Sequence, residues 1–250
     1  MLNVPAYLER IRYAGPTAPT PETLQAIHRA HLLAVPFENL DIHLGRKIVC
    51  DEGRFLHKIV AERRGGFCYE LNGAFAALLR ALGFQVILLS ARVPCADGSD
   101  GPEFDHLTLH VDLDEPWLAD VGFGDGFLEP LRLNARVKQP QIGRTYRLTD
   151  VEGVLSLEVM ADDKWKKEYS FTLQPRQLSD FAAMCHYHQT SPESHFTRNR
   201  ICSRVTAEGR VTLSNDKLIE TRNGVRSERV LAGDQEWREI LHERFGVPPP

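Results

Sequence analysis

The chain has 250 residues, of which 42% are hydrophobic and 26% are charged, and its formal net charge is −4 at pH 7. This composition is enough for a substantial core, and it shows no basic stripe of the kind that binds nucleic acid. The first residues lack the apolar segment of a signal peptide, and no apolar run approaches membrane-spanning length, so we expect a cytoplasmic protein without a membrane partner.

Helical patterns fill the first third of the chain. Thr20 is a suitable N-cap and Pro21 a suitable first helical residue, so we predict a helix over residues 21–33. A second helix is expected over residues 51–63, and a third begins at Cys68.

Cys68 stands in the segment RGGFCYE, which covers residues 64–70. The unpaired N–H groups and the positive dipole end of a helix N-terminus favour a thiolate, the nucleophilic form of cysteine. Gly65 and Gly66 allow a sharp turn into the helix, which would leave the sulfur accessible. Cys68 is therefore a candidate nucleophile, and a buried structural cysteine is the alternative.

Strand patterns prevail beyond residue 84. We expect strands over residues 85–93, 106–113, 117–121, 146–149, 155–161 and 166–172, separated by clusters of Gly, Asp, Asn and Pro. A short helix over 175–187, strands around 205–213 and over 217–221, and a last helix over 234–245 complete the chain. This order predicts an α+β protein with a closed or strongly curved antiparallel sheet.

A proton acceptor for Cys68 is expected on the second of these strands. The alternation places His106, Thr108 and His110 on one face, and Asp120 ends the next strand. A tight turn between these strands would bring His106 and Asp120 within hydrogen-bond range. Thiol, imidazole and carboxylate could then act as nucleophile, proton acceptor and orienting group. His110 is an equally available imidazole, and an Asp at a strand end is more commonly a turn former.

The remaining cysteines and histidines indicate no metal centre. The chain has five cysteines at irregular spacing and no CxxC motif, which favours free thiols in a reducing compartment. Cys185, His186, His188 and His195 lie close together in the sequence, but their spacing matches none of the common zinc patterns. We therefore expect neither a structural nor a catalytic metal.

Five segments resemble the arylamine N-acetyltransferases, in that family's order. Three of them contain the candidate catalytic residues: RGGFCYELNG at 64–73, DHLTL at 105–109 and LADVGFG at 118–124. Two flanking segments, VPFENLD at 35–41 and TSPESHF at 190–196, agree as well. The resemblance implies that Cys68, His106 and Asp120 form a catalytic triad, in a core arranged as in cysteine proteases.

The family's fold consists of a helical bundle, an antiparallel β-barrel and an α/β lid. On this chain these parts correspond to residues 1–84, 85–187 and 188–250, with a lid that is short for the family. The resemblance also implies acetyl-CoA as donor and an aromatic amine or hydrazine as acceptor, in a ping-pong reaction through an acetyl-cysteine.

The family's ring-contacting positions match Phe37 and Phe123, with Val93 as a further candidate for the acceptor pocket. The glycine-rich turn with Gly124 and Gly126 is the best local seat for the donor's phosphates, although Asp125 between them is unfavourable beside an anion. Thr206 resembles a family position near the cofactor. The physiological acceptor, the acyl chain and the choice between monomer and homodimer stay open.

Two other activities would use the same three residues. An amide synthase of this family would accept a polyketide from a carrier on Cys68 and close a macrolactam with the substrate's own aryl amine. A cysteine hydrolase of the papain or transglutaminase type also uses Cys, His and Asp or Asn in this chain order, but the surrounding motifs argue against it.

Overall fold

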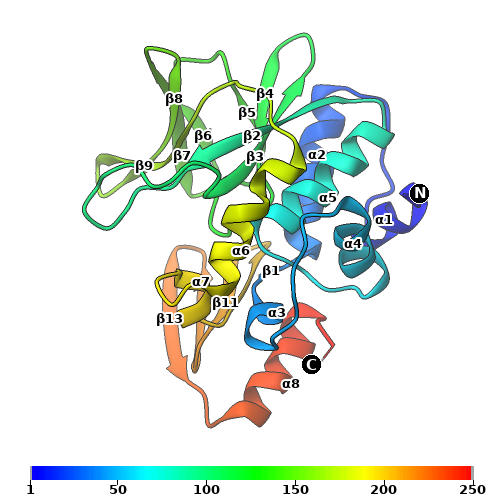
Figure 1. Ribbon diagram of the computed structural model, residues 1–250, viewed down its shortest axis with the longest axis vertical. Coiled ribbons are helices and arrows are strands. Elements are labelled where there is room, and N and C mark those ends of the chain that lie inside the picture. Colours follow the sequence, from blue (N-terminus) through cyan, green and yellow to red (C-terminus); the bar gives the residue numbers. More distant parts are fainter. Residues whose placement is uncertain (1, 249–250) are drawn as a thin grey trace.

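The computed structural model describes residues 2–248, and the N-terminal part of the chain is helical (Figure 1). Its helices are α1 (Val4–Arg10), α2 (Pro21–Ala34), α3 (Leu40–His43), α4 (Glu52–Leu56) and α5 (Cys68–Ala81). A π-helical turn over His57–Ala61 continues α4. The helices predicted over residues 21–33 and 51–63, and the helix that begins at Cys68, are confirmed, whereas α1 and α3 were not predicted.

Local capping explains where two of these helices begin. The side chain of Thr20 accepts a hydrogen bond from the Thr23 N–H at 3.3 Å, as expected for an N-cap. At the start of α5, the Phe67 N–H donates to the carboxylate of Glu70 at 3.1 Å. Helix α5 is central, because every residue from Cys68 to Leu79 is buried and the helix packs between α4 and strands of the large sheet (Figure 1).

The large sheet has eight antiparallel strands in the order β5-β4-β3-β2-β9-β8-β7-β6. They are β2 (Gln85–Arg92), β3 (His106–Asp112), β4 (Pro116–Ala119), β5 (Leu131–Arg132), β6 (Gln139–Gln141), β7 (Arg144–Val151), β8 (Val154–Ala161) and β9 (Lys164–Phe171). The side chain of Gln139 on one edge strand binds both backbone groups of Arg132 on the other, at 2.9 and 3.1 Å. The sheet is therefore nearly closed into a barrel, as predicted.

A smaller antiparallel sheet of five strands lies in the lower part of Figure 1. Its strands, in sheet order, are β1 (Phe37–Glu38), β10 (Ile201–Thr206), β11 (Gly209–Ser214), β12 (Lys217–Arg222) and β13 (Val225–Val230). Helix α8 (Asp234–Phe245) covers one face through a buried cluster that includes Leu213, Trp237 and Leu241. Helices α6 (Ala182–Thr190) and α7 (His195–Arg198) connect the two sheets.

Several elements differ from the expectations, among them the short strands β5 and β6 and the helix α7, which were not predicted. The single strand predicted around 205–213 is a hairpin, β10 and β11, which turns at residues 207–208. That turn contains Ala and Glu rather than the usual turn residues, so the sequence does not mark it. The helix predicted over 175–187 is a short 3-10 turn, Leu178–Phe181, followed by α6, which extends to Thr190. Strand β13 was missed because its residues are all exposed and show no alternation.

The hydrophobic residues form three buried clusters: one around α5, one inside the barrel and one beneath α8. The α+β class and the barrel agree with the sequence analysis. The domain boundaries at residues 84 and 187 stay a prediction. Within residues 2–248, no helix is both long enough and apolar enough to cross a membrane.

Candidate active site

Cys68 is the first residue of α5, and its side chain is almost entirely buried. Burial raises the pKa of the Cys68 thiol well above its ordinary value, and the nearby carboxylates of Asp105 and Asp120 add to this effect. Hydrogen bonds from the backbone of Leu107 and Tyr69 lower the pKa but do not outweigh burial. The helix N-terminus alone therefore does not produce the thiolate that the sequence led us to expect, and Cys68 needs a neighbouring base.

The glycines before Cys68 are required by close packing. A Cβ at Gly65 would lie 1.9 Å from the carbonyl oxygen of Pro36, and one at Gly66 would lie 2.7 Å from the Cβ of Glu70. Neither glycine has a positive φ, so the sharp turn expected from their sequence is not the reason for them. Their absent side chains let the segment before α5 pair with β1, where the Glu38 N–H donates to the Gly66 carbonyl at 2.8 Å.

A buried group of five charged side chains supports this segment beside the start of α5. The Lys58 ammonium lies 2.8 Å from Glu70 and 2.9 Å from Asp41. The Arg64 guanidinium lies 2.8 Å from Glu38 and 2.5 Å from Asp41. Burial raises the pKa of Glu70 to about 7, although Lys58 acts in the opposite direction. The Arg and Glu of the segment RGGFCYE thus hold the approach to Cys68 in place.

His106 and Asp120 come together on neighbouring strands. Strands β3 and β4 pair in an antiparallel register that matches Asp112 with Pro116, and His106 Nε2 lies 2.7 Å from Asp120 Oδ2. This contact assigns the imidazole proton to Nε2, because a carboxylate oxygen can only accept. His106 Nδ1, which has no hydrogen-bond partner among residues 2–248, is then the basic nitrogen.

His110, the alternative imidazole, lies elsewhere on the same strand. It pairs with Leu118 in the ladder rather than lying at the strand end near Asp120. Both of its ring nitrogens lack a hydrogen-bond partner among the described residues, and burial lowers its pKa. The structure therefore places His106, and not His110, against a carboxylate.

Asp120 accepts four hydrogen bonds in a site that is nearly inaccessible to water. Oδ2 accepts from His106 and from the Tyr169 hydroxyl, the latter at 2.9 Å. Oδ1 accepts from Asn72 Nδ2 at 2.8 Å and from the Gly122 N–H at 3.0 Å. Burial alone would raise the pKa of Asp120, but His106 and these donors outweigh it and hold the pKa below its ordinary value. The carboxylate is therefore ionised and fixed in orientation.

Sequence reasoning assigned no role to three residues that hold Asp120 or its backbone. Asn72 lies four residues after Cys68, so helical spacing could have placed it on the same face of α5. Tyr169 on β9 gave no comparable signal. His28 on α2 accepts a hydrogen bond from the Asp120 N–H at 3.1 Å and donates through Nδ1 to the Leu128 carbonyl at 3.0 Å. Burial lowers the pKa of His28 to about 4, so the ring is neutral.

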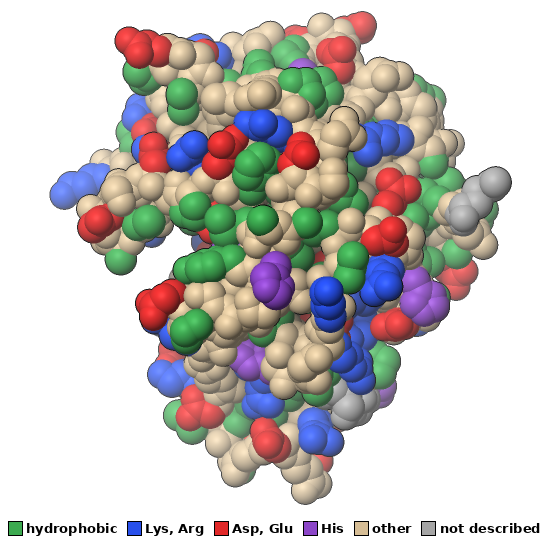
Figure 2. Space-filling model, in the orientation of Figure 1, with side chains coloured by type: hydrophobic (Ala, Val, Ile, Leu, Met, Phe, Trp, Pro, Cys, Tyr) green, Lys and Arg blue, Asp and Glu red, His purple; other side chains and the backbone are tan. Residues whose placement is uncertain are grey.

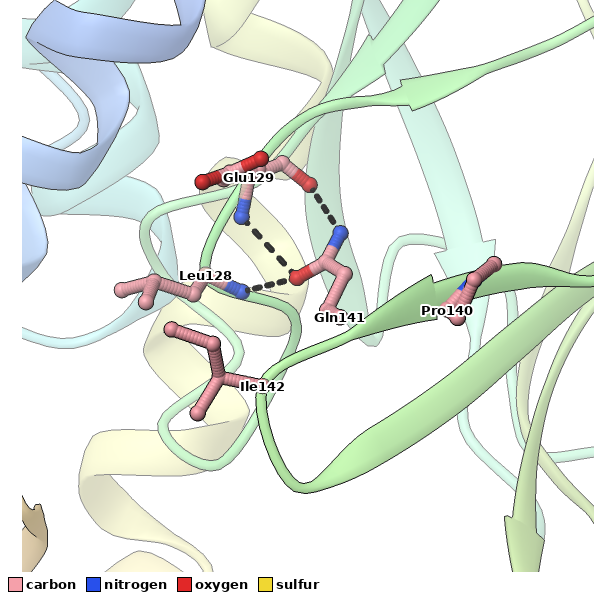
Figure 3. A pocket seen from close by; sticks show the side chains of 5 residues that line it. All are labelled: Leu128, Glu129, Pro140, Gln141 and Ile142. Carbon is pink, nitrogen blue, oxygen red and sulfur yellow. Dashed lines mark hydrogen bonds between the residues drawn. The ribbon is translucent and has the colours of Figure 1, made fainter.

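The Gln141 side chain holds the segment around Leu128 in place, and these residues line a surface hollow (Figure 3). The side-chain oxygen of Gln141 accepts from the N–H groups of Leu128 and Glu129 at 2.9 and 3.1 Å, and its nitrogen donates to the Glu129 carbonyl at 2.6 Å (Figure 3). These contacts fix the segment whose carbonyl group holds His28.

A cavity of about 1030 Å³ contains the candidate nucleophile and the imidazole. Its wall includes residues of both sheets, of α6 and α7, and of the loop between β2 and β3. Figure 2 shows an indentation at the left edge, between the part with the eight-stranded sheet and the part with α7 and β13. Cys68 and His106 thus line the same cavity.

The predicted substrate and cofactor residues are distributed unevenly around this cavity. Phe37, Phe123, Val93 and Gly124 line it, whereas Gly126 and Thr206 are not among its lining residues. Because side chains alternate along β10 and Ser203 faces the cavity, Thr206 lies on the opposite face of the strand. Its predicted contact with the cofactor receives no support from this geometry.

Aromatic rings surround the reactive groups. The Phe123 ring contacts His106 edge-on with centroids 5.2 Å apart, and it contacts Tyr169 at 5.1 Å. The Phe37 ring is tilted against that of Phe196, which belongs to the segment TSPESHF, with ring centroids 6.1 Å apart. This wall suits a flat apolar ligand.

The residues considered for a metal site make separate contacts. His188 Nε2 lies 3.1 Å from the Asp105 carboxylate, and His195 Nδ1 lies 3.1 Å from the Asn199 amide. Cys185 accepts a hydrogen bond from Gln189 at 3.2 Å. Within residues 2–248, no three His, Cys, Asp or Glu side chains are grouped to hold a metal ion.

Known proteins are similar to this chain over most of its length. A family model described as "N-acetyltransferase" matches residues 20–248. The arylamine N-acetyltransferase / N-hydroxyarylamine O-acetyltransferase of Salmonella typhimurium is 36% identical over 246 residues, which cover 97% of this chain and 88% of that protein. The arylamine N-acetyltransferase of Escherichia coli is 35% identical over 245 residues, covering 96% and 87%.

Solved structures show the same similarity in three dimensions. The Salmonella typhimurium arylamine N-acetyltransferase superimposes with a TM-score of 0.94 at 34% identity, covering 99% of this chain and 92% of that one. The Mycobacterium marinum arylamine N-acetyltransferase in complex with CoA gives a TM-score of 0.91 at 32% identity, covering 98% and 93%.

Proposed function

The chain belongs to the arylamine N-acetyltransferase family, and on that premise we propose that it moves an acetyl group from acetyl-CoA to the nitrogen of an aromatic amine or hydrazine. In this proposal the acetyl group is held in between as a thioester on Cys68. The observation that carries the proposal is the cavity that joins Cys68 to His106, whose imidazole is held by Asp120 at 2.7 Å.

In the first half-reaction, Nδ1 of His106 accepts the thiol proton as Sγ of Cys68 attacks the donor's acetyl carbon. The carbon–sulfur bond to CoA breaks, and the proton on His106 passes to the departing CoA sulfur. One thioester replaces another, so the exchange is close to balanced in energy. Because burial raises the pKa of the Cys68 thiol, this proton transfer is the step that generates the nucleophile.

In the second half-reaction, the acceptor nitrogen attacks the acetyl carbon on Cys68. His106 accepts the N–H proton as the new bond forms and returns it to the departing sulfur. Asp120 stays ionised, keeps the imidazole proton on Nε2 and stabilises the imidazolium that forms in each half-reaction.

The cavity wall supports a division between acceptor and donor. We assign Phe37, Phe123 and Val93 to the acceptor pocket, since all three line the cavity and the Phe123 ring contacts His106. For the donor's phosphates we retain the turn with Gly124 as a candidate. Gly126 and Thr206 keep only the support of the family resemblance.

Intact-mass analysis after mixing with acetyl-CoA tests this function directly. We expect a gain of about 42 Da on the wild-type chain, corresponding to one acetyl group on a nucleophile. The gain should disappear when an aryl hydrazine is added, and it should be absent in Cys68→Ser. Cys202→Ser, which alters another buried cysteine, is the matched control and should retain the gain.

Two results would contradict the proposal. Turnover by a folded Cys68→Ser variant would exclude the thioester on this residue. Acetylation that is discharged by water as fast as by the hydrazine would indicate a hydrolase. An amide synthase would fail to exchange with the soluble donor, and its Cys68 would gain no mass.

A further inference from the structure

The five-stranded sheet presents a row of polar residues to the active-site cavity. Arg210 on β11 is the cross-strand partner of Thr221 on β12, and Thr221 is the partner of Arg226 on β13. Directly opposed residues share one face of a sheet, and all three residues line the cavity. Two guanidinium groups therefore flank one hydroxyl on the cavity wall.

The neighbouring row on the same face contains two hydroxyl groups between the apolar residues Phe37 and Ile219. Ser203 and Thr212 are cross-strand partners, their hydroxyl oxygens are 2.7 Å apart, and both line the cavity. Arg210 Nη1 donates to the Ser203 hydroxyl at 3.0 Å. The opposite face of this sheet is apolar and packs on α8. The face toward the cavity therefore carries these polar side chains together with Ile201 and Ile219, which also line the cavity.

The arginines of this wall have partners that leave positive charge available. Arg210 Nε lies 2.8 Å from Asp125, and Arg144 on β7 lies 2.6 Å from the same carboxylate, so two cations share one anion. The Asp125 side chain is 60% exposed, whereas the Arg210 side chain is only 17% exposed. Arg226 lies 2.9 Å from Glu228, and Arg226 itself is largely exposed.

Arg210 also keeps one group unused. Its Nη2 has no hydrogen-bond partner among residues 2–248, although its Nε and Nη1 are both engaged. A guanidinium held on two sides by protein presents its third side in a fixed direction. Such a group is suited to a phosphate, which accepts several N–H and O–H donors at once.

We propose that Arg210, Thr221 and Arg226 form the binding site for the phosphate groups of the acyl donor. Arg210 and Arg226 lie two strands apart, about 9.5 Å at the usual strand spacing, so they can contact different phosphates of one CoA molecule. Asp125 in the glycine-rich turn does not oppose this site, because the two positive charges of Arg144 and Arg210 outweigh the single negative charge of its carboxylate. The inference rests on the proposed function, since it names the residues that bind the acetyl-CoA used in that reaction.

Equilibrium binding of three probes to the wild-type chain and its variants tests the site. The probes are CoA, 3′-dephospho-CoA and pantetheine, which has no phosphate. Arg210→Gln should weaken CoA binding by about 10- to 100-fold, the usual loss for a hydrogen bond to a charged group. It should leave pantetheine binding unchanged. Arg226→Gln and Thr221→Val should act in the same direction with smaller effects, because Arg226 is more exposed and Thr221 is uncharged.

Arg222→Gln is the matched control. Arg222 follows Thr221 on β12, so it lies on the other face of the sheet, and it does not line the cavity. This variant should bind all three probes as the wild-type chain does. Equal weakening of CoA and pantetheine by Arg210→Gln would overturn the proposal, because it would indicate a structural role, and so would unchanged CoA binding.

A second readout separates this proposal from the proposed function. Acetylation of Cys68 by S-acetyl-pantetheine requires the nucleophile but no phosphate site, so it should proceed equally in wild type and Arg210→Gln. If the wild-type chain is not acetylated at all, the proposed function fails. If both chains are acetylated but CoA binds them equally, only the phosphate site is wrong.

Discussion

The neutral His28 beneath Asp120 makes the stability of the fold depend on pH in a predictable way. Burial lowers the pKa of His28 from 6.5 to about 4 in the folded chain. Below about pH 6.5 the unfolded chain takes up a proton on this residue, whereas the folded chain does so only near pH 4. Between these values the unfolded state binds more protons. His28 therefore stabilises the fold fully above pH 6.5, and this contribution is lost as the pH falls toward 4.

The size of the effect follows from the shift. Each pKa unit corresponds to about 1.4 kcal/mol, so the full shift is worth about 3 kcal/mol, of which about 2 kcal/mol is lost by about pH 5. His28→Gln removes the titrating group. Its free energy of unfolding should be lower than that of wild type by about 1–3 kcal/mol at neutral pH, because the Asp120 N–H or the Leu128 carbonyl loses its partner.

Urea unfolding at about pH 7.5 and about pH 5 measures this difference. Wild type should lose about 2 kcal/mol more than His28→Gln between the two pH values, so the two stabilities should converge in acid. His186→Gln is the control, since His186 is an exposed residue of α6 and should leave the wild-type difference unchanged. Parallel losses in wild type and His28→Gln would refute the reasoning.

Three further changes test the site itself. Gly122→Ala places a Cβ 2.9 Å from the backbone of Cys68, so it should cost about 1–3 kcal/mol of stability and lower turnover about 100-fold. Gly126→Ala, whose added Cβ would have its nearest neighbour at 3.3 Å, should have only a small effect on both quantities. Equal effects of the two variants would contradict the packing argument. His106→Gln should abolish the reaction with iodoacetamide at neutral pH while His110→Gln retains it, and the reverse would identify the wrong imidazole. Phe123→Ala should raise KM for an aryl hydrazine more than it slows acetylation by the donor, and slowed loading with normal discharge would exclude it from the acceptor pocket.

The sequence predicted the elements whose signals are local. Thr20 and Pro21 mark the start of α2, and the alternation from His106 onward marks β3. The short segment between β3 and β4 allows only an antiparallel hairpin, which brings Asp120 alongside His106. The family motifs added the candidate nucleophile and its partners, because each motif is a short run of neighbouring residues.

Local sequence signals failed where tertiary packing or the surroundings of a side chain determine the structure or the pKa. The turn between β10 and β11 has no Gly, Pro, Asn or Asp at its two central positions, so the hairpin was predicted as one strand. The glycines before Cys68 are needed because Pro36 approaches them closely, not because the chain turns there. The pKa of the Cys68 thiol depends on all the residues that bury it, and its position at the start of a helix does not indicate how deeply it is buried.

The tertiary structure alone decided which groups complete the site. His28 is 92 residues from Asp120 in the chain and Tyr169 is 49 residues from it, yet both donate to or accept from that residue. The row of Arg210, Thr221 and Arg226 exists only because two hairpins bring three strands into register. Periodicity in the sequence determines which face of a strand a residue occupies. The contacts that this face makes depend on long-range packing, and the chemistry of these side chains depends on those contacts.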